Sequence, residues 1–151
     1  MAPSPAPARI VLDTNAWLDL LVFADPRIAA IEAALSGGRL EAITSEPCRE
    51  EWRRVLGYPL LSLAPPRREA LMTAFDARAR IVEVAPAGAE LLPQCRDRDD
   101  QKFLELALAG GARWLISRDK ALLRLNRRTR RDGLFEILVP EAWRPSLGPV
   151  P

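Results

Sequence analysis

Acidic side chains stand at four separated places in the sequence, each next to the end of an expected strand or within an expected helix. They are Asp13, Glu51, the group Asp97, Asp99 and Asp100, and Asp119. Two carboxylates held about 4 Å apart repel each other by roughly 4 kcal/mol at an effective dielectric constant near 20. A fold that gathers them needs a cation, and oxygen donors alone favour Mg²⁺ or Mn²⁺, which keep several waters. Such an ion lowers the pKa of a bound water and neutralises charge on a phosphodiester.

The absence of histidine from the chain is consistent with metal binding by carboxylates. The 151 residues include 22 Lys and Arg, 20 Asp and Glu, 2 Cys and no His, with a net charge of +2. Without histidine the chain cannot build a Ser-His-Asp triad, an imidazole base or a His-ligated zinc or iron site. Cys48 and Cys95 match no metal-binding spacing, so we expect reduced thiols. Carboxylate-only metal catalysis needs none of these groups.

Short apolar runs alternate with longer segments of helical period, which is typical of an α/β domain with a parallel sheet. Four of the five candidate strands are rich in Ile, Val and Leu and barely alternate, as expected for strands covered on both faces. The candidate strands are 10–12, 40–44, 81–84, 114–117 and 135–139. Helices are expected at 26–35, 45–56, after Pro66, at 99–109 and at 119–125, followed by an irregular tail from Pro140.

These elements bring the acids together. The carboxyl ends of parallel strands share one edge of a sheet, and open α/β sheets bind ligands there. Asp13 closes the first strand and Asp119 follows the fourth, so both should emerge at that edge. On the helix after the second strand, Glu51 shares a stripe with the apolar Val55, which favours Glu51 over Glu50 as the inward acid. The sequence leaves open which acid of the third group points inward: Asp97, Asp99 or Asp100.

Four motifs in this order resemble the PIN-domain family, and within it the toxin components of toxin–antitoxin systems. They are VLDTN at 11–15, SEPCREEWRRVL at 45–56, DRDDQKFLELA at 97–107 and SRD at 117–119. Each motif is short, but the resemblance extends from about Ile10 to Val139. The chain departs from the family pattern in three places. Arg98 stands where proline is common, Ser117-Arg118 replaces Thr-Gly, and Trp52 replaces leucine.

The resemblance implies a three-layer α/β/α sandwich around a central, mostly parallel five-stranded sheet, with a Mg²⁺- or Mn²⁺-dependent endoribonuclease site. It assigns the four catalytic acids to Asp13, Glu51, Asp100 and Asp119. Of these, Asp13, Asp100 and Asp119 would hold the metal. Supporting positions in the site are Asn15, Ser117, Asp97 and Asp99. The resemblance also implies an RNA substrate, a cognate antitoxin protein and a homodimer.

A basic segment begins beside the last acidic motif. Between residues 113 and 131 the only acid is Asp119, whereas arginine is frequent. Next to a metal site, such a segment suits a phosphate backbone. The same charges are compatible with an acidic antitoxin segment or with a solvated face. The candidate RNA contacts are Arg118, Lys120, Arg124, Arg127 and Arg128.

The length suits a single domain, which we place over residues 1–151, with a core at about 9–140 and flexible tails at 1–8 and 144–151. Residues 1–8 contain no basic region followed by an apolar run. No uncharged apolar stretch approaches the roughly 20 residues that cross a bilayer. We therefore expect a cytoplasmic protein without a membrane segment.

The same acids allow other interpretations. Asp13, Asp100 and Asp119 could each serve only to cap or polarise the start of a helix. A phosphatase of the haloacid dehalogenase class also has Asp after a first strand, but it needs a second Asp two positions on, where this chain has Asn15. A catalytically weak PIN-like module would bind RNA or a protein partner without turnover. The leading hypothesis is the metal-dependent endoribonuclease, acting as the toxin of a type II toxin–antitoxin system.

Overall fold

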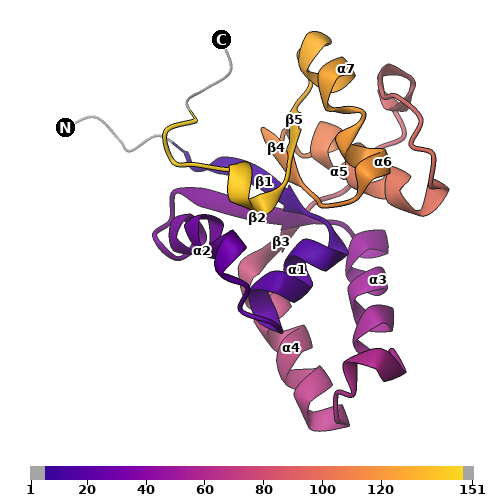
Figure 1. The fold of residues 1–151 in the computed structure, drawn as a ribbon. Coiled ribbons are helices and arrows are strands. Elements are labelled where there is room, and N and C mark those ends of the chain that lie inside the picture. The colour runs from indigo at the N-terminus through magenta and orange to yellow at the C-terminus, as the bar shows by residue number, and fades with distance from the viewer. Residues whose placement is uncertain (1–5, 148–151) are drawn as a thin grey trace.

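A sheet of five parallel strands forms the centre of the molecule (Figure 1). The structure is a computed structural model and describes residues 6–147. The strands are hydrogen-bonded in the order β3-β2-β1-β4-β5, and all four neighbouring pairs are parallel. Their bounds are β1 Ala8–Leu12, β2 Leu40–Thr44, β3 Ala79–Ile81, β4 Trp114–Ile116 and β5 Glu136–Leu138.

Helices cover both faces of the sheet, which confirms the expected three-layer α/β/α arrangement (Figure 1). The first half of the chain supplies α1 Thr14–Leu21, α2 Ala29–Ser36, α3 Glu46–Leu56 and α4 Pro65–Arg78. The second half supplies α5 Gln101–Ala109, α6 Lys120–Leu123 and α7 Asn126–Arg131. Short 3-10 turns lie at Pro26–Ile28, Pro59–Leu61, Ala89–Leu91, Arg98–Asp100 and Pro140–Ala142.

The central strands bury side chains on both faces. In β1, Ile10 and Leu12 join a core shared with α1, α2, α3 and α4, whereas Val11 joins a second core with α5 and α6. Leu115 of β4 also belongs to the second core. Burying one such side chain contributes about 1.5–3 kcal/mol. Because both faces are covered, these strands show no alternation of polar and apolar residues.

Helix α3 is held by both cores, and this orients the acid that it carries. Cys48 packs in the second core and Trp52 in the first. The ring of Trp52 stacks on Phe75 of α4 with 5.5 Å between centroids, and Phe75 lies 4.6 Å from the ring of Trp17 in α1. Glu51 stands between these two anchors of α3, so its direction is fixed by the packing on either side.

The edge strand β3 ends earlier than the sequence predicts. It covers Ala79–Ile81 instead of 81–84. A further sheet hydrogen bond joins the Val82 amide to the Thr44 carbonyl at 2.9 Å. Val82 and Val84 then pack against the second core from the side. Their apolar character therefore reflects packing under the helices, not strand pairing.

Two further segments differ from expectation. Helix α7 is not predicted by the apolar pattern, because Thr129 is its one buried residue. The segment after Pro140 is less irregular than expected: it forms a 3-10 turn, and Trp143 is buried edge-on against Trp114, with 5.7 Å between ring centroids.

Of the expected tails, 1–5 and 148–151 lie outside the described residues, and β1 already begins at Ala8. Within residues 6–147, no helix has the length and apolar character needed to cross a membrane.

Candidate active site

The acidic residues gather at the point where the strand order reverses. On one side of β1 lie β2 and β3, and on the other lie β4 and β5. Open α/β sheets bind ligands beyond the carboxyl ends of strands at such a point. Leu12 and Ile116 are register partners, and the Asp13 amide donates to the Ile116 carbonyl at 3.1 Å. Asp13 and Ser117 therefore begin their loops side by side.

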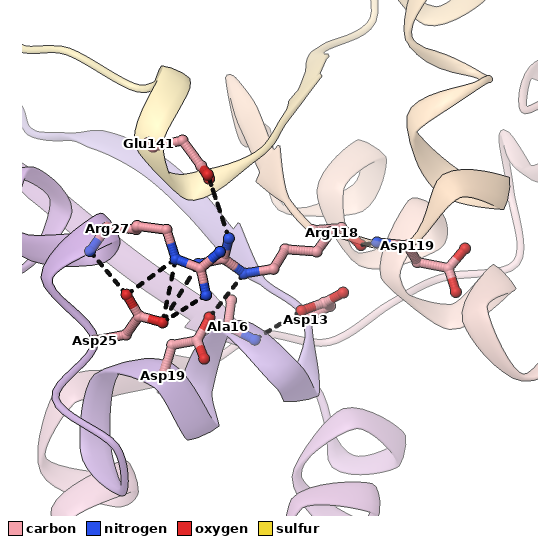
Figure 2. A network of polar contacts seen from close by, with 9 residues as sticks. Asp13, Ala16, Asp19, Asp25, Arg27, Arg118, Asp119 and Glu141 are labelled. Atoms are coloured by element: carbon pink, nitrogen blue, oxygen red, sulfur yellow. Dashed lines mark hydrogen bonds and ion pairs between the residues drawn. The ribbon is translucent and has the colours of Figure 1, made fainter.

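Asp13 is buried, with 5% of its surface exposed. It is the N-cap of α1, and its Oδ1 accepts a hydrogen bond from the Ala16 amide at 2.8 Å (Figure 2). Burial is the largest cause of a carboxyl pKa raised from 3.8 to about 7; hydrogen bonds from Ser117 and Ala16 oppose it, and the charges of Asp100 and Asp119 add to it. Because the cap uses Oδ1, the capping role does not occupy Oδ2.

Asp119, like Asp13, is both a member of the acidic cluster and the N-cap of a helix, in this case α6. Its Oδ1 accepts hydrogen bonds from the amides of Ala121 at 2.7 Å and Leu122 at 3.2 Å. The Asp119 amide donates to the hydroxyl oxygen of Ser117 at 2.9 Å. Ser117 is fully buried and also hydrogen-bonds the Asp13 carboxyl. Ser117 thus contacts both Asp13, which follows β1, and Asp119, which follows β4.

Asp100 is the inward acid of the third group. It is partly buried, whereas Asp97 and Asp99 are exposed. Burial is the largest cause of an Asp100 carboxyl pKa raised from 3.8 to about 6, followed by the charges of Asp119, Asp97 and Glu51. Asp97 caps the 3-10 turn before α5 by accepting from the Asp99 amide at 2.9 Å. Asp100 stands at the N-cap of α5 without a side-chain capping bond.

The Glu51 carboxylate contacts two residues that the sequence patterns do not single out, Thr14 and Lys102. Its Oε2 accepts a hydrogen bond from the Thr14 hydroxyl, and its Oε1 lies 2.7 Å from Nζ of Lys102. The same ammonium donates to the Asp99 carbonyl at 2.6 Å and lowers the pKa of Asp100. Lys102 could have been found from its place three residues after Asp99, on the first turn of α5.

The basic residues expected to contact RNA do not form one surface. Lys120 begins α6 beside Asp119 and is exposed, as is Arg124. Arg128 lies 3.9 Å from Asp132 in an ion pair along α7. Arg127 lines a separate cavity of about 870 Å³ that includes residues before β4 and β5, away from the acids. Lys120 therefore follows an acid of the cluster in the chain and is exposed, whereas Arg127 lies elsewhere.

Arg118, another predicted RNA contact, lies apart from the acids. Arg118 turns away from Asp119 toward Asp19, Asp25 and Glu141 (Figure 2). Asn15, expected to support the site, is exposed on the first turn of α1.

The donor set fits a hard divalent cation. Every acid in the cluster offers carboxylate oxygen, and burial and mutual repulsion raise the pKa of both Asp13 and Asp100. A cation relieves that repulsion. No group of three acidic or thiol side chains within residues 6–147 meets the geometry of a metal site as it stands. Mg²⁺ usually takes one or two carboxylates directly and keeps several waters.

Comparisons with known proteins give the same fold. A family model described as PIN domain matches residues 9–121. No curated protein matches the chain. A similar solved structure is a chain in the crystal structure of VapBC2 from Rickettsia felis bound to a DNA fragment from their promoter. Its TM-score is 0.59 at 12% sequence identity, over 85% of this chain and 96% of that chain. At that identity the similarity concerns the fold alone.

Proposed function

This chain belongs to the PIN-domain family, and on that premise we propose that it is a Mg²⁺- or Mn²⁺-dependent endoribonuclease and the toxin of a type II toxin–antitoxin pair. The observation that carries the proposal is the meeting of Asp13, Asp100 and Asp119 at the carboxyl ends of β1 and β4, where the charges of Asp100 and Asp119 raise the pKa of Asp13. Carboxylates gathered in this way suit a divalent ion and a phosphodiester substrate.

In the proposed site, Asp13, Asp100 and Asp119 hold the ion directly or through water. When bound, the ion lowers the pKa of a water and neutralises charge on the scissile phosphate. The chain orients these ligands: the amides of α1 and α6 fix one oxygen of Asp13 and Asp119. Ser117 holds the Asp119 amide, and Lys102 balances the charge of Glu51.

An exposed cation beside the acids gives the RNA backbone a place to bind. Lys120 directly follows Asp119 and is exposed, so its ammonium can meet a phosphate next to the scissile bond. Arg124 is exposed one turn further along the chain. Lys120→Gln should therefore weaken RNA binding and reduce its dependence on salt.

The partner that we propose is an antitoxin protein. The similar Rickettsia chain comes from a VapBC2 complex, which supports a comparable pairing here. Large apolar side chains also stand exposed in this chain, among them Phe23, Tyr58 and Leu60, with Leu60 97% exposed. Apolar surface of this kind suits contact with another protein. The expected homodimer can be checked by light scattering of the isolated chain.

The decisive test is cleavage of a mixed RNA pool by purified protein with Mg²⁺ or Mn²⁺, with mapping of the cut sites. We expect the activity to disappear in EDTA and in Asp13→Asn. Glu50→Gln is a matched control, because Glu50 is exposed one position from Glu51. Cleavage by the purified Asp13→Asn protein in EDTA would refute the proposal. RNA binding without turnover under any divalent ion would favour the catalytically weak module.

A further inference from the structure

Arg118 lies in the chain between two residues of the site, but its side chain leaves the acidic cluster. The Arg118 guanidinium extends away from Asp119, across its loop (Figure 2). There it reaches Asp19, Asp25 and Glu141. The side chain is thus tied to carboxylates of its own chain at the place where the sequence predicts an RNA contact.

Each nitrogen of the guanidinium meets a different carboxylate. Nε donates to Asp19 Oδ2 at 3.1 Å, and Nη1 donates to Glu141 Oε1 at 3.2 Å. Nη2 lies 3.9 Å from Asp25 Oδ2, an ion-pair distance, but is buried without a hydrogen-bond partner. The planar fork of arginine can address three directions at once, whereas the ammonium of lysine is a single point charge. The arrangement therefore uses a property that is specific to arginine.

These carboxylates belong to segments that are distant in the sequence. Asp19 is on α1, the helix that Asp13 caps. Asp25 caps the 3-10 turn at Pro26–Ile28, and Glu141 belongs to the turn at Pro140–Ala142. Arg118 therefore fastens the loop between β4 and α6 to α1 and to the turn after β5. Asp13 and Asp119 stand on the two parts that it joins.

The charge around Arg118 argues against a phosphate contact. Its three carboxylate neighbours share one other cation, Arg27, which binds Asp25 at 2.8 Å. Three negative charges against two positive charges leave a net negative group, which repels a phosphate backbone. A phosphate would also have to displace hydrogen bonds that Arg118 already makes.

We propose that Arg118 is a positioning residue that holds the loop of Ser117 and Asp119 against α1 and so fixes Asp119 relative to Asp13. The consequence for ion binding rests on the proposed function, whereas the consequence for the loop does not.

The test compares Arg118→Gln with the matched control Arg27→Gln. Arg27 shares Asp25 with Arg118 but touches neither Ser117 nor Asp119 in the contacts described. NMR hydrogen exchange of the Asp119 amide, measured in EDTA, reports on the loop without any ion. We expect exchange about tenfold faster in Arg118→Gln, the scale of losing one charge-assisted hydrogen bond, and wild-type exchange in Arg27→Gln.

Two further measurements separate positioning from RNA contact. We expect Arg118→Gln to weaken Mg²⁺ affinity about tenfold, as for other residues that orient metal ligands, and to lower kcat with an unchanged KM. RNA affinity in EDTA should stay within about twofold of wild type, since one lost phosphate contact would reduce both affinity and salt slope. Arg118→Lys should restore the loop and the Mg²⁺ affinity only in part.

The outcomes distinguish the two proposals. Unchanged Asp119 exchange in Arg118→Gln would overturn the positioning role, and reduced RNA affinity alongside it would assign Arg118 to the substrate. If Arg118→Gln does not fold, Asp19→Ala removes the Nε acceptor while leaving the loop sequence intact, and the same changes are expected. A wild-type protein that binds no divalent ion would defeat the proposed function, while the exchange measurement would still decide the role of Arg118.

Discussion

Replacing Asp13 with asparagine should stabilise the protein while removing its proposed activity. Folding raises the pKa of this carboxyl from 3.8 to about 7, so the folded protein binds the proton more tightly than the unfolded chain does. The wild-type free energy of unfolding therefore falls as pH rises between these two values. At about 1.4 kcal/mol for each tenfold change in proton affinity, the rise in pKa corresponds to about 4 kcal/mol at most.

Asparagine avoids this cost because it is neutral and keeps the helix cap. Its Oδ1 can accept the hydrogen bond that the Ala16 amide donates to Asp13 at 2.8 Å. At about pH 8, Asp13→Asn should exceed wild type by up to about 4 kcal/mol, and the difference should vanish near pH 4. Urea denaturation in EDTA, followed by the fluorescence of the buried tryptophans, measures both proteins across this range.

Asp76 provides a control of opposite sign. Its carboxylate accepts hydrogen bonds from Arg49 Nε at 2.8 Å and Nη2 at 2.9 Å, and these lower its pKa. Asp76→Asn should therefore be less stable than wild type at neutral pH, with the loss shrinking as pH falls through the Asp76 pKa. Parallel pH profiles for wild type and Asp13→Asn would refute the reasoning. Saturating Mg²⁺ should stabilise wild type more than Asp13→Asn.

Three further substitutions probe separate parts of the structure. Asp119→Ala removes the cap of α6 and should lower the free energy of unfolding by about 1 kcal/mol, while Asp119→Asn should not; equal urea midpoints for the two would contradict the capping role. Lys102→Met removes a charge that lowers the pKa of Asp100, so NMR titration should give a value above the wild-type one of about 6. An unchanged titration would place the ammonium away from the cluster. Phe75→Ala should cost about 3–5 kcal/mol because a cavity opens among buried aromatic rings; a cost below about 1 kcal/mol in urea unfolding would show that the site collapses freely.

The sequence predicts the sheet well where burial alone determines the pattern. The expected strands at 10–12, 40–44 and 114–117 lie within one or two residues of β1, β2 and β4, because both faces of these strands are buried. The prediction is less accurate at the edge. Val82 and Val84 are apolar for packing reasons unrelated to strand pairing. The sequence does not predict the strand order, because apolar patterns contain no information on which strands are neighbours.

Charge is harder to interpret from sequence than apolar periodicity. Arg118 and Arg127 look alike in a basic segment, yet Arg118 binds carboxylates of its own chain and Arg127 lines a separate cavity. Hydrophobic side chains mostly pack in the core, so their burial can be predicted from the local pattern. The direction of a charged side chain depends on partners that are remote in the sequence. Thr14, which donates to Glu51, could not be identified for the same reason.

Asp13 and Asp119 each use one carboxylate oxygen to accept a hydrogen bond from the backbone of a helix. Helix capping and ion binding therefore place different requirements on these two positions. Serine, threonine or asparagine can cap a helix about as well as aspartate. The architecture alone therefore accepts several residue types at these positions, and the second oxygen is the one that the chemistry requires. A chain with serine at both positions would keep a side-chain oxygen for each helix cap but would lose the carboxylates that the proposed metal site requires.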